Sequence, residues 1–384
     1  MSKDYDVVIA GGGIIGCAIA YYLRKLTDYT VLVIEKGRIG SEASSAAAGM
    51  LGAQAELNEA GPLYTMARES RILFPELSRE LKEICGIDIE FIDKGLFKTA
   101  GDESEVLKLK RLIDFHNNNG QPAHWVAGPE LLKMEPRLSD RVAGAMFLPK
   151  DGQVNPVQLT RAFAESASRL GAVFLDFTEV AGFDFSQSGI DVQTSAGMYY
   201  GEKVVLASGV WTGKLAVQSG LHMPMFPVKG ECLSLTFLEP VITSTVIADE
   251  CYLVPKRGGR LVVGATMETG SYDRKVRAKG VLELLSKASA VLPGILHGEW
   301  EKAWTGFRPQ TPDGLPYMGK HPCHKDLYIA AGHFRNGILL SPLTGRWMAE
   351  LLEGKLQEET LREFAPDRFA YEKNERMSFH EVDC

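Results

Sequence analysis

Residues 6–35 read DVVIAGGGIIGCAIAYYLRKLTDYTVLVIE, and they give the clearest indication of the fold. Its two ends, 6–10 and 30–35, are short apolar runs rich in β-branched side chains, a composition typical of strands buried on both faces. Residues 15–26 between them have the composition of a helix, and the glycines before them form a turn. Two parallel strands joined by a helix make a βαβ unit, so we expect the chain to begin with one.

The turn itself, GGGIIG at 11–16, matches the G-x-G-x-x-G pattern of dinucleotide-binding folds. Gly11 permits the tight turn, Gly13 lets a pyrophosphate approach the backbone, and Gly16 lets the helix pack closely on the strand. Glu35 follows about 20 residues later, where an acid can accept hydrogen bonds from ribose hydroxyls. The helix N-terminus offers unpaired N–H groups to phosphates. The pattern therefore predicts a dinucleotide site rather than a turn without a ligand, although glycines alone do not separate NAD from FAD.

The composition excludes several other classes of protein. The chain has 384 residues, of which 45% are hydrophobic and 24% charged, as in a globular protein of roughly two or three domains. A net charge of −7 argues against nonspecific nucleic-acid binding. Six scattered cysteines without metal-ligand spacing are read as free thiols in a reducing cytosol, and no metal is expected. The apolar run at 7–23 is preceded by acids and broken by glycines, so neither a signal peptide nor a membrane span is expected.

Beyond the first unit, helical and strand patterns alternate along the chain. We expect helices near 63–85, 104–116, after Asn155-Pro156, at 280–292 and after Ser341-Pro342, and strands near 89–92, 95–100, 173–176, 190–194, 203–207, 299–306 and 326–330, with a mostly β region over 226–267. Elements of α/β type at both ends, with a β region between them, predict an α/β domain interrupted by an antiparallel domain.

Two further segments indicate a ligand larger than a nucleotide alone. Residues 44–50, SSAAAGM, are too small and too uncharged for a surface loop, and they suit a large flat ring system pressed against the backbone. Residues 331–339, AGHFRNGIL, form a second glycine-punctuated turn at a helix start and are a candidate anion site.

Taken together, these segments resemble the D-amino-acid-oxidase-like flavoprotein family over about residues 4–370. The segments that carry the resemblance are SSAAAGMLGAQAE at 44–56, ASGVW at 207–211, PVKGECLS at 227–234, CYLVP at 251–255, GRLVVGATM at 259–267, GFRPQTPDG at 306–314 and AAGHFRNGILLSP at 330–342. The resemblance implies a Rossmann-like, glutathione-reductase-like FAD-binding domain of α/β type, interrupted by an α+β substrate domain built on an antiparallel sheet. It divides the chain into an FAD-binding domain of 1–85, 145–225 and 305–370, a substrate domain of 86–144 and 226–304, and a polar tail of 371–384.

The resemblance also assigns residues to FAD. Ile14 and Ile15 would meet the pyrophosphate, Glu35 and Lys36 the adenosine ribose, and Val180 the adenine. The diphosphate and flavin would be lined by Ala43, Ser44, Ser45, Ala48, Gly49 and Met50, and the flavin site closed by His333, Phe334, Arg335, Asn336, Gly337, Ile338 and Leu339. Relatives that tether FAD do so through a cysteine where this chain has Gly306, so we predict non-covalent FAD.

The substrate site is expected around Arg308. An arginine in GFRP surroundings could form a structural ion pair, but its guanidinium also suits a bidentate clamp on a carboxylate, and the resemblance implies the clamp. Tyr252, otherwise a core tyrosine, would add a hydrogen bond to the same carboxylate, and Arg335 would add positive charge. Met267 would form an apolar wall, although methionine is more often core filler. His333 is expected to contact the flavin rather than to act in catalysis.

The reaction that the resemblance implies is the oxidation of glycine, sarcosine and small D-amino acids. Hydride passes from the substrate Cα to flavin N5, water hydrolyses the imine to an oxo acid and ammonia or an amine, and O2 reoxidises the flavin to give H2O2. The resemblance places such enzymes in thiazole formation for thiamine, in the cytoplasm, as homotetramers. A dehydrogenase with another electron acceptor and a flavin-binding subunit of a larger oxidase remain alternatives. Glu250 is a candidate for favouring the ammonium form of the substrate, and the chain end, EVDC, has no peroxisomal tripeptide.

Overall fold

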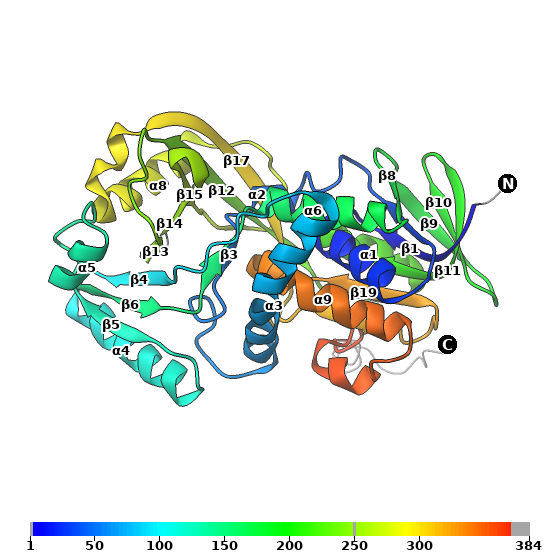
Figure 1. Cartoon of the computed structure of the whole chain (residues 1–384). Coiled ribbons are helices and arrows are strands. Elements are labelled where there is room, and N and C mark those ends of the chain that lie inside the picture. Colours follow the sequence, from blue (N-terminus) through cyan, green and yellow to red (C-terminus); the bar gives the residue numbers. More distant parts are fainter. Residues whose placement is uncertain (1–2, 249–250, 370–384) are drawn as a thin grey trace, which may run out of the picture.

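Two β-sheets organise the molecule, as the computed structural model shows for residues 3–248 and 251–369 (Figure 1). The first sheet is built on parallel strands, and the second is mostly antiparallel. Glu250 and the polar tail at 371–384, both singled out in the sequence, lie outside the described residues.

The parallel strands of the first sheet run in the order β19-β11-β1-β2-β8. They are β1 (Lys3–Ala10), β2 (Val31–Ile34), β8 (Val173–Leu175), β11 (Gly197–Leu206) and β19 (Leu327–Ala331), and the antiparallel strands β9 (Val180–Phe185), β10 (Ile190–Thr194) and β18 (Tyr317–Lys320) extend the sheet. β1 pairs in parallel with both β2 and β11. This central position explains the unbroken apolar run at the start of the chain, because both faces of β1 are covered.

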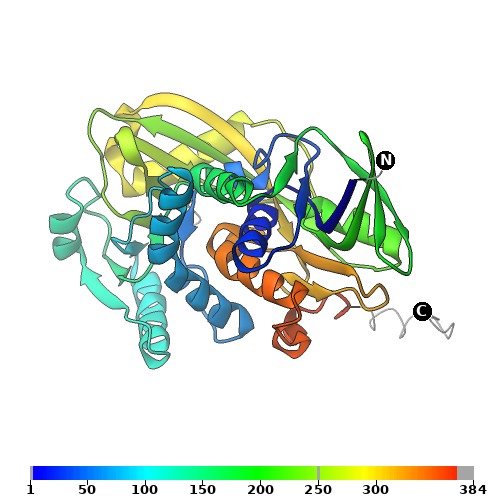
Figure 2. The ribbon, with the colours of Figure 1, turned by 45° about the vertical axis from the view of Figure 1, so that its right-hand side comes forward.

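Helices cover one face of this sheet, and a strand pair with a short helix covers the other. The helices of the first face are α1 (Ile14–Leu26), α3 (Pro62–Cys85), α6 (Pro156–Arg169) and α9 (Gly337–Leu352). Figure 2 shows α1 between α6 and α9. Val7 and Ile9 pack under these helices, whereas Val8 and Ala10 pack under β9, β10 and α7 (Thr212–Ala216). Because side chains alternate along β1, they pack into two separate hydrophobic cores, one on each face of the sheet.

The second sheet has the strand order β16-β12-β15-β14-β13-β4-β6-β5, with β17 paired to β12. Its strands are β4 (Leu96–Ala100), β5 (His124–Ala127), β6 (Gly144–Leu148), β12 (Phe226–Thr236), β13 (Thr245–Ala248), β14 (Cys251–Pro255), β15 (Arg260–Gly264), β16 (Glu268–Thr269) and β17 (Glu299–Gln310). Helices α4 (Glu103–Asn118), α5 (Gly128–Met134) and α8 (Ala278–Val291) contact it. β12 and β17 are the longest of these strands and pair over most of their length.

The second sheet extends slightly past the predicted domain division. β6 pairs with β4 and β5, so residues as far as Leu148 belong to this sheet rather than to the parallel one. β17 continues in the second sheet to Gln310, five residues beyond the predicted boundary at 305. A separate two-stranded sheet is formed by β3 (Met50–Leu51) and β7 (Gly152–Gln153).

Two predicted elements differ from the structure. Within the expected strand at 89–92, only Ile92 pairs, through a single bridge to Gln153. The last helix begins at Gly337 rather than after Ser341-Pro342, so Pro342 lies inside it. Proline has no N–H for the carbonyl four residues earlier, which here is Ile338, and the Ser341 hydroxyl donates to that carbonyl at 2.9 Å instead. The side-chain bond allows the helix to start earlier than its proline suggested.

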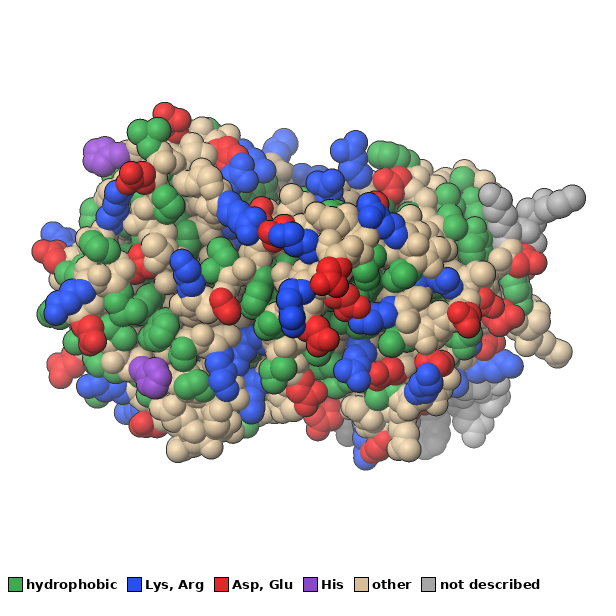
Figure 3. Space-filling view, viewed as in Figure 1, with side chains coloured by type: hydrophobic (Ala, Val, Ile, Leu, Met, Phe, Trp, Pro, Cys, Tyr) green, Lys and Arg blue, Asp and Glu red, His purple; other side chains and the backbone are tan. Residues whose placement is uncertain are grey.

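The surface seen in Figure 3 carries both signs of charge, interspersed with apolar side chains. No helix within the described residues is long and apolar enough to cross a membrane.

Candidate functional site

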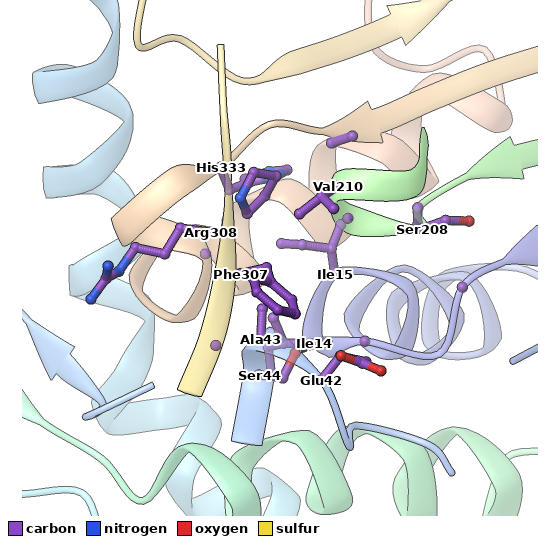
Figure 4. A pocket seen from close by; sticks show the side chains of 18 of the residues that line it. Ile14, Ile15, Glu42, Ala43, Ser44, Ser208, Val210, Phe307, Arg308 and His333 are labelled. Carbon is purple, nitrogen blue, oxygen red and sulfur yellow. Dashed lines mark hydrogen bonds between the residues drawn. The ribbon is translucent and has the colours of Figure 1, made fainter. Parts of the chain in front are cut away.

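A cavity of about 490 Å³ lies where the two sheets meet. From the first sheet, it is lined by the residues that follow β1, β11 and β19 at their carboxyl ends, and from the second by residues of β12, β14 and β17. Open parallel sheets bind ligands at the carboxyl ends of their strands, so the position of this cavity is the one expected for a dinucleotide. Figure 4 shows side chains from both sources converging on it.

The glycine turn forms one wall. Gly11, Gly13, Ile14 and Ile15 line the cavity, and Gly13 caps α1 without any side-chain hydrogen bond. Ser44 Oγ accepts from Ile14 N at 2.9 Å. Gly16 does not line the cavity: a Cβ at this position would lie 1.9 Å from the Gly11 carbonyl oxygen, so its role is the close contact that keeps the turn tight. The helix N-terminus therefore faces the cavity with donors available to phosphates.

Glu35 lies against the same turn. Its carboxylate accepts from the Gly12 and Gly37 backbone N–H groups, each at 2.9 Å, and it lines the cavity together with Lys36 and Val180. The Lys36 ammonium lies 3.4 Å from the centroid of the Trp211 ring. This end of the cavity therefore combines the fixed Glu35 carboxylate with the aromatic ring of Trp211. A carboxylate can accept hydrogen bonds from a ribose, and an aromatic ring can pack against an adenine.

The small-residue segment lies beside Ile14. The cavity lining includes Ala43, Ser44, Ala48, Gly49 and Met50. Ser45 is directed away, because its hydroxyl donates to the carbonyls of Ser41 and Glu42 within the loop. The side chains of this wall are uncharged, which is compatible with a large ring system.

The turn after β19 forms another wall. His333, Phe334, Arg335, Asn336, Gly337 and Ile338 line the cavity. Leu339 does not, since it lies one turn into α9, where its carbonyl accepts from Ser70 Oγ at 2.7 Å. Burial lowers the pKa of His333 to about 3, and its Nε2 lies 3.1 Å from Thr344 Oγ1. The imidazole is therefore neutral and held by a hydrogen bond, which favours a contact role.

Arg308, on β17, provides a positive charge at the other end of the cavity from Glu35 and Lys36. Its guanidinium lies over Gly230, where a Cβ would be 2.4 Å from both Nη atoms. Arg308 Nη1 donates to the Thr266 carbonyl at 3.4 Å, and no carboxylate of residues 3–248 or 251–369 lies within 4 Å of it. The half-buried guanidinium thus has no anionic partner from the described chain, and a carboxylate ligand would supply one.

Tyr252, on β14, lies near Arg308 in the same lining. Its hydroxyl is 3.4 Å from Cys232 Sγ, and burial raises the tyrosine pKa well above its usual range. The phenol therefore stays neutral and can donate a hydrogen bond. Cys232 was not expected in this lining, although it lies two residues after Gly230 on β12 and so on the same face of the strand.

Arg335 differs from Arg308 in having a carboxylate partner. Arg335 Nη2 donates to Glu56 Oε1 at 2.8 Å, and both residues line the cavity. Glu56 was also missed, although it ends one of the segments that carry the family resemblance. Met267 is not a wall of this cavity, contrary to expectation: it lies in the short link between β15 and β16, where its side chain is 62% exposed. Met50 is an apolar side chain that does line it.

Comparisons with known proteins agree with this geometry. The family model described as FAD dependent oxidoreductase, DAO, matches residues 6–351. The chain belongs to this family. Among its members, glycine oxidase from Geobacillus kaustophilus is 47% identical over 95% of this chain and 97% of its own, and glycine oxidase from Bacillus subtilis is 40% identical over 96% and 98%. The crystal structure of the Geobacillus kaustophilus protein superposes with a TM-score of 0.93 over 96% of this chain and 99% of that one.

As a member of the FAD-dependent oxidoreductases, the chain is an enzyme with FAD as its cofactor, and the fold class predicted from the sequence is confirmed. The residues present fit FAD. A helix N-terminus whose cap residue is a glycine, a carboxylate fixed by two backbone N–H groups and a wall of uncharged side chains all face one cavity.

Proposed function

We propose that the chain is a glycine oxidase, which oxidatively deaminates glycine, sarcosine and small D-amino acids to an oxo acid, ammonia or an amine, and H2O2. The proposal rests on one observation about Arg308. Its guanidinium lies in the same cavity as the dinucleotide turn and has no anionic partner among the described residues. Two relatives named glycine oxidase, at 47% and 40% identity over nearly the whole chain, support it.

For FAD, we assign the turn at Gly11–Ile15 and Ser44 to the phosphates, Glu35 to the ribose and the wall from Ala48 to Met50 to the flavin. FAD, when bound, supplies the two-electron oxidation of the substrate amine. The turn at 333–338 closes the cavity beside it. Gly306 offers no thiol for a covalent link, so acid precipitation should release the flavin from the protein.

For the substrate, we assign Arg308 and Tyr252 to the carboxylate. A guanidinium and a phenolic O–H at one end of the cavity would fix both the position and the direction of a small amino acid. The neutral His333 has its Nε2 occupied by Thr344, so it is not positioned as a general base. The substrate amine is therefore expected to react in its neutral form, having lost its proton to solvent.

The test is oxygen uptake with peroxide detection on the purified flavoprotein, with glycine, sarcosine, D-alanine, D-proline and L-alanine as substrates. Turnover of glycine with one peroxide per oxygen supports the proposal. Failure of all five substrates to bleach the flavin would overturn it.

A second candidate is a dehydrogenase that passes electrons to an acceptor other than O2. The favouring observation is the similarity to the structure of L-proline dehydrogenase from P. horikoshii, at 28% identity and a TM-score of 0.85 over 96% of this chain. In that case substrate would bleach the flavin without oxygen uptake, and an artificial acceptor would restore turnover.

We also propose a metabolic role, a cellular location and an oligomeric state. Proteins named bifunctional ThiO/ThiG match this chain at 31% identity over 96% of its length and 55% of theirs, which supports a role in supplying the imine for thiazole formation. We propose a cytoplasmic location and a homotetramer on the family resemblance.

A further inference from the structure

Lys229 is a buried charge that the proposed function does not use. It lies on β12, and its side chain is 1% exposed. Its neighbour Gly230 lies directly beneath the guanidinium of Arg308. Because side chains alternate along a strand, Lys229 and Glu231 point to the face of β12 opposite Gly230. A lysine is seldom fully buried unless its charge is paired, so its partners show what it holds.

The partners of Lys229 belong mostly to one segment, residues 266–277, which we call the strap. Lys229 Nζ donates to the Lys275 carbonyl at 2.8 Å, and it lies 3.8 Å from carboxylate oxygens of both Glu268 and Asp273. Its remaining ion-pair partner is Glu231, at 3.1 Å. Beyond β16 the strap has no ladder pairing. Its second half is held by this ammonium, by Thr305 Oγ1, which donates to the Arg274 carbonyl at 3.2 Å, and by Arg274 Nη2, which donates to Glu42 Oε1 at 2.8 Å. Among these ties, Lys229 is the fully buried charge.

Glu231 holds both ends of the strap. Its backbone N–H donates to Thr266 Oγ1 at 2.9 Å, and its carbonyl accepts from Thr266 N at 3.2 Å. Its carboxylate accepts from Arg277 N at 3.2 Å. Since Lys229 neutralises this nearly buried carboxylate, the two residues form one anchoring unit.

The strap in turn contacts two consecutive residues of the cavity wall. Figure 4 shows Phe307 and Arg308 leaving β17 on opposite sides. The Thr266 carbonyl accepts from Arg308 Nη1 at 3.4 Å. The Phe307 ring lies 5.8 Å from the Tyr272 ring and 5.5 Å from the Arg274 guanidinium carbon. The strap thus braces the carboxylate cation and the neighbouring apolar wall from outside the cavity.

We propose that Lys229 is a positioning residue for the substrate site, which acts through the strap to hold Arg308 and Phe307 in place. The inference rests on the proposed function for the identity of the ligand, a small amino-acid carboxylate. Lys229 itself touches neither substrate nor FAD, so its loss should weaken carboxylate binding while the oxidation step is retained.

The experiment compares the FAD-loaded wild type with Lys229→Met. We expect KM for glycine and the dissociation constant of glycolate, measured by calorimetry, to rise together by about fivefold or more, with kcat within about twofold of the wild type. Limited trypsin digestion should cut faster at Arg274, Lys275 or Arg277. Lys302→Met, which removes an exposed lysine of the same sheet, is the control for loss of charge and should behave as the wild type.

If Lys229→Met does not fold, Glu231→Gln tests the same anchor with little change of shape. Unchanged KM, glycolate affinity and trypsin pattern in a folded anchor variant would overturn the inference, as would equal effects in Lys302→Met. A wild type that oxidises no amino acid would instead overturn the proposed function. The trypsin comparison, together with binding of glycolate to the wild type and the variant, would still decide the role of Lys229.

Discussion

Gly230 lies so close beneath the guanidinium of Arg308 that a Cβ at residue 230 would be 2.4 Å from both of its Nη atoms. In the β12–β17 ladder, Gly230 pairs with Gly306 and Arg308 pairs with Val228. The register of these two strands therefore fixes the position of Gly230 relative to Arg308. Even the smallest side chain at 230 would therefore displace the cation.

Gly230→Ala should raise KM for glycine by about tenfold, because the added methyl group displaces the guanidinium from its place in the cavity. FAD content should not change, since residue 230 lies at the Arg308 end of the cavity. Steady-state kinetics and the flavin-to-protein absorbance ratio check both statements. An unchanged KM would show that Arg308 reaches the carboxylate from another position.

Arg308→Met should lower kcat/KM for glycine by about a hundredfold or more, because the substrate carboxylate would enter the cavity without its cation. Arg308→Lys should recover only part of this loss, since an ammonium cannot form the same pair of parallel hydrogen bonds. Retention of full activity in Arg308→Met would remove Arg308 from the substrate site.

Glu56→Gln should make the substrate end of the cavity more positive, because Arg335 would lose the carboxylate that lies 2.8 Å away. Simple carboxylate inhibitors such as glycolate should then bind several-fold more tightly at low ionic strength, and the gain should shrink as salt is added. Glu59→Gln, a substitution at an exposed residue of the same loop, serves as the control. Weaker glycolate binding in Glu56→Gln would mean that Glu56 itself orients Arg335 for the ligand.

His321 should make stability fall in acid. It is 3% exposed, its Nδ1 accepts from Cys323 N and His324 N, and burial lowers its pKa to about 4. Between the unfolded pKa of about 6.5 and pH 4, the unfolded chain binds a proton here that the folded chain does not, so the free energy of unfolding falls as pH decreases, by up to about 1.4 kcal/mol per pH unit.

Urea denaturation of the wild type and of His321→Asn at pH 7 and pH 5 measures this effect. The variant should be the less stable protein at pH 7, and the difference should narrow at pH 5, because only the wild type loses stability through this group. A constant difference between the two pH values would contradict the expected titration.

The dinucleotide turn and the fold built on it could be predicted from local sequence alone. The spacing of Gly11, Gly13, Gly16 and Glu35 is local, and each residue contributes through backbone geometry that its type dictates. The longer helices and most strands were also predicted from local sequence patterns, whereas the short helices α5 and α7 were not. The start of α9 was not predicted. Helix propensity does not reveal that the Ser341 hydroxyl donates to the Ile338 carbonyl, which compensates for the N–H that Pro342 lacks.

The pairing of charges, by contrast, depends on the packing of segments that are far apart in the chain. Arg308 and Arg335 are both arginines in glycine-rich surroundings, yet Glu56, which is distant in the chain, pairs with Arg335 and leaves Arg308 without a partner among the described residues. In the same way, Met267 lies outside the cavity and Cys232 lines it, because the path of the strap and the register of β12 set their directions. Pairing and direction depend on which strands become neighbours, and sequence spacing does not encode that for residues far apart in the chain.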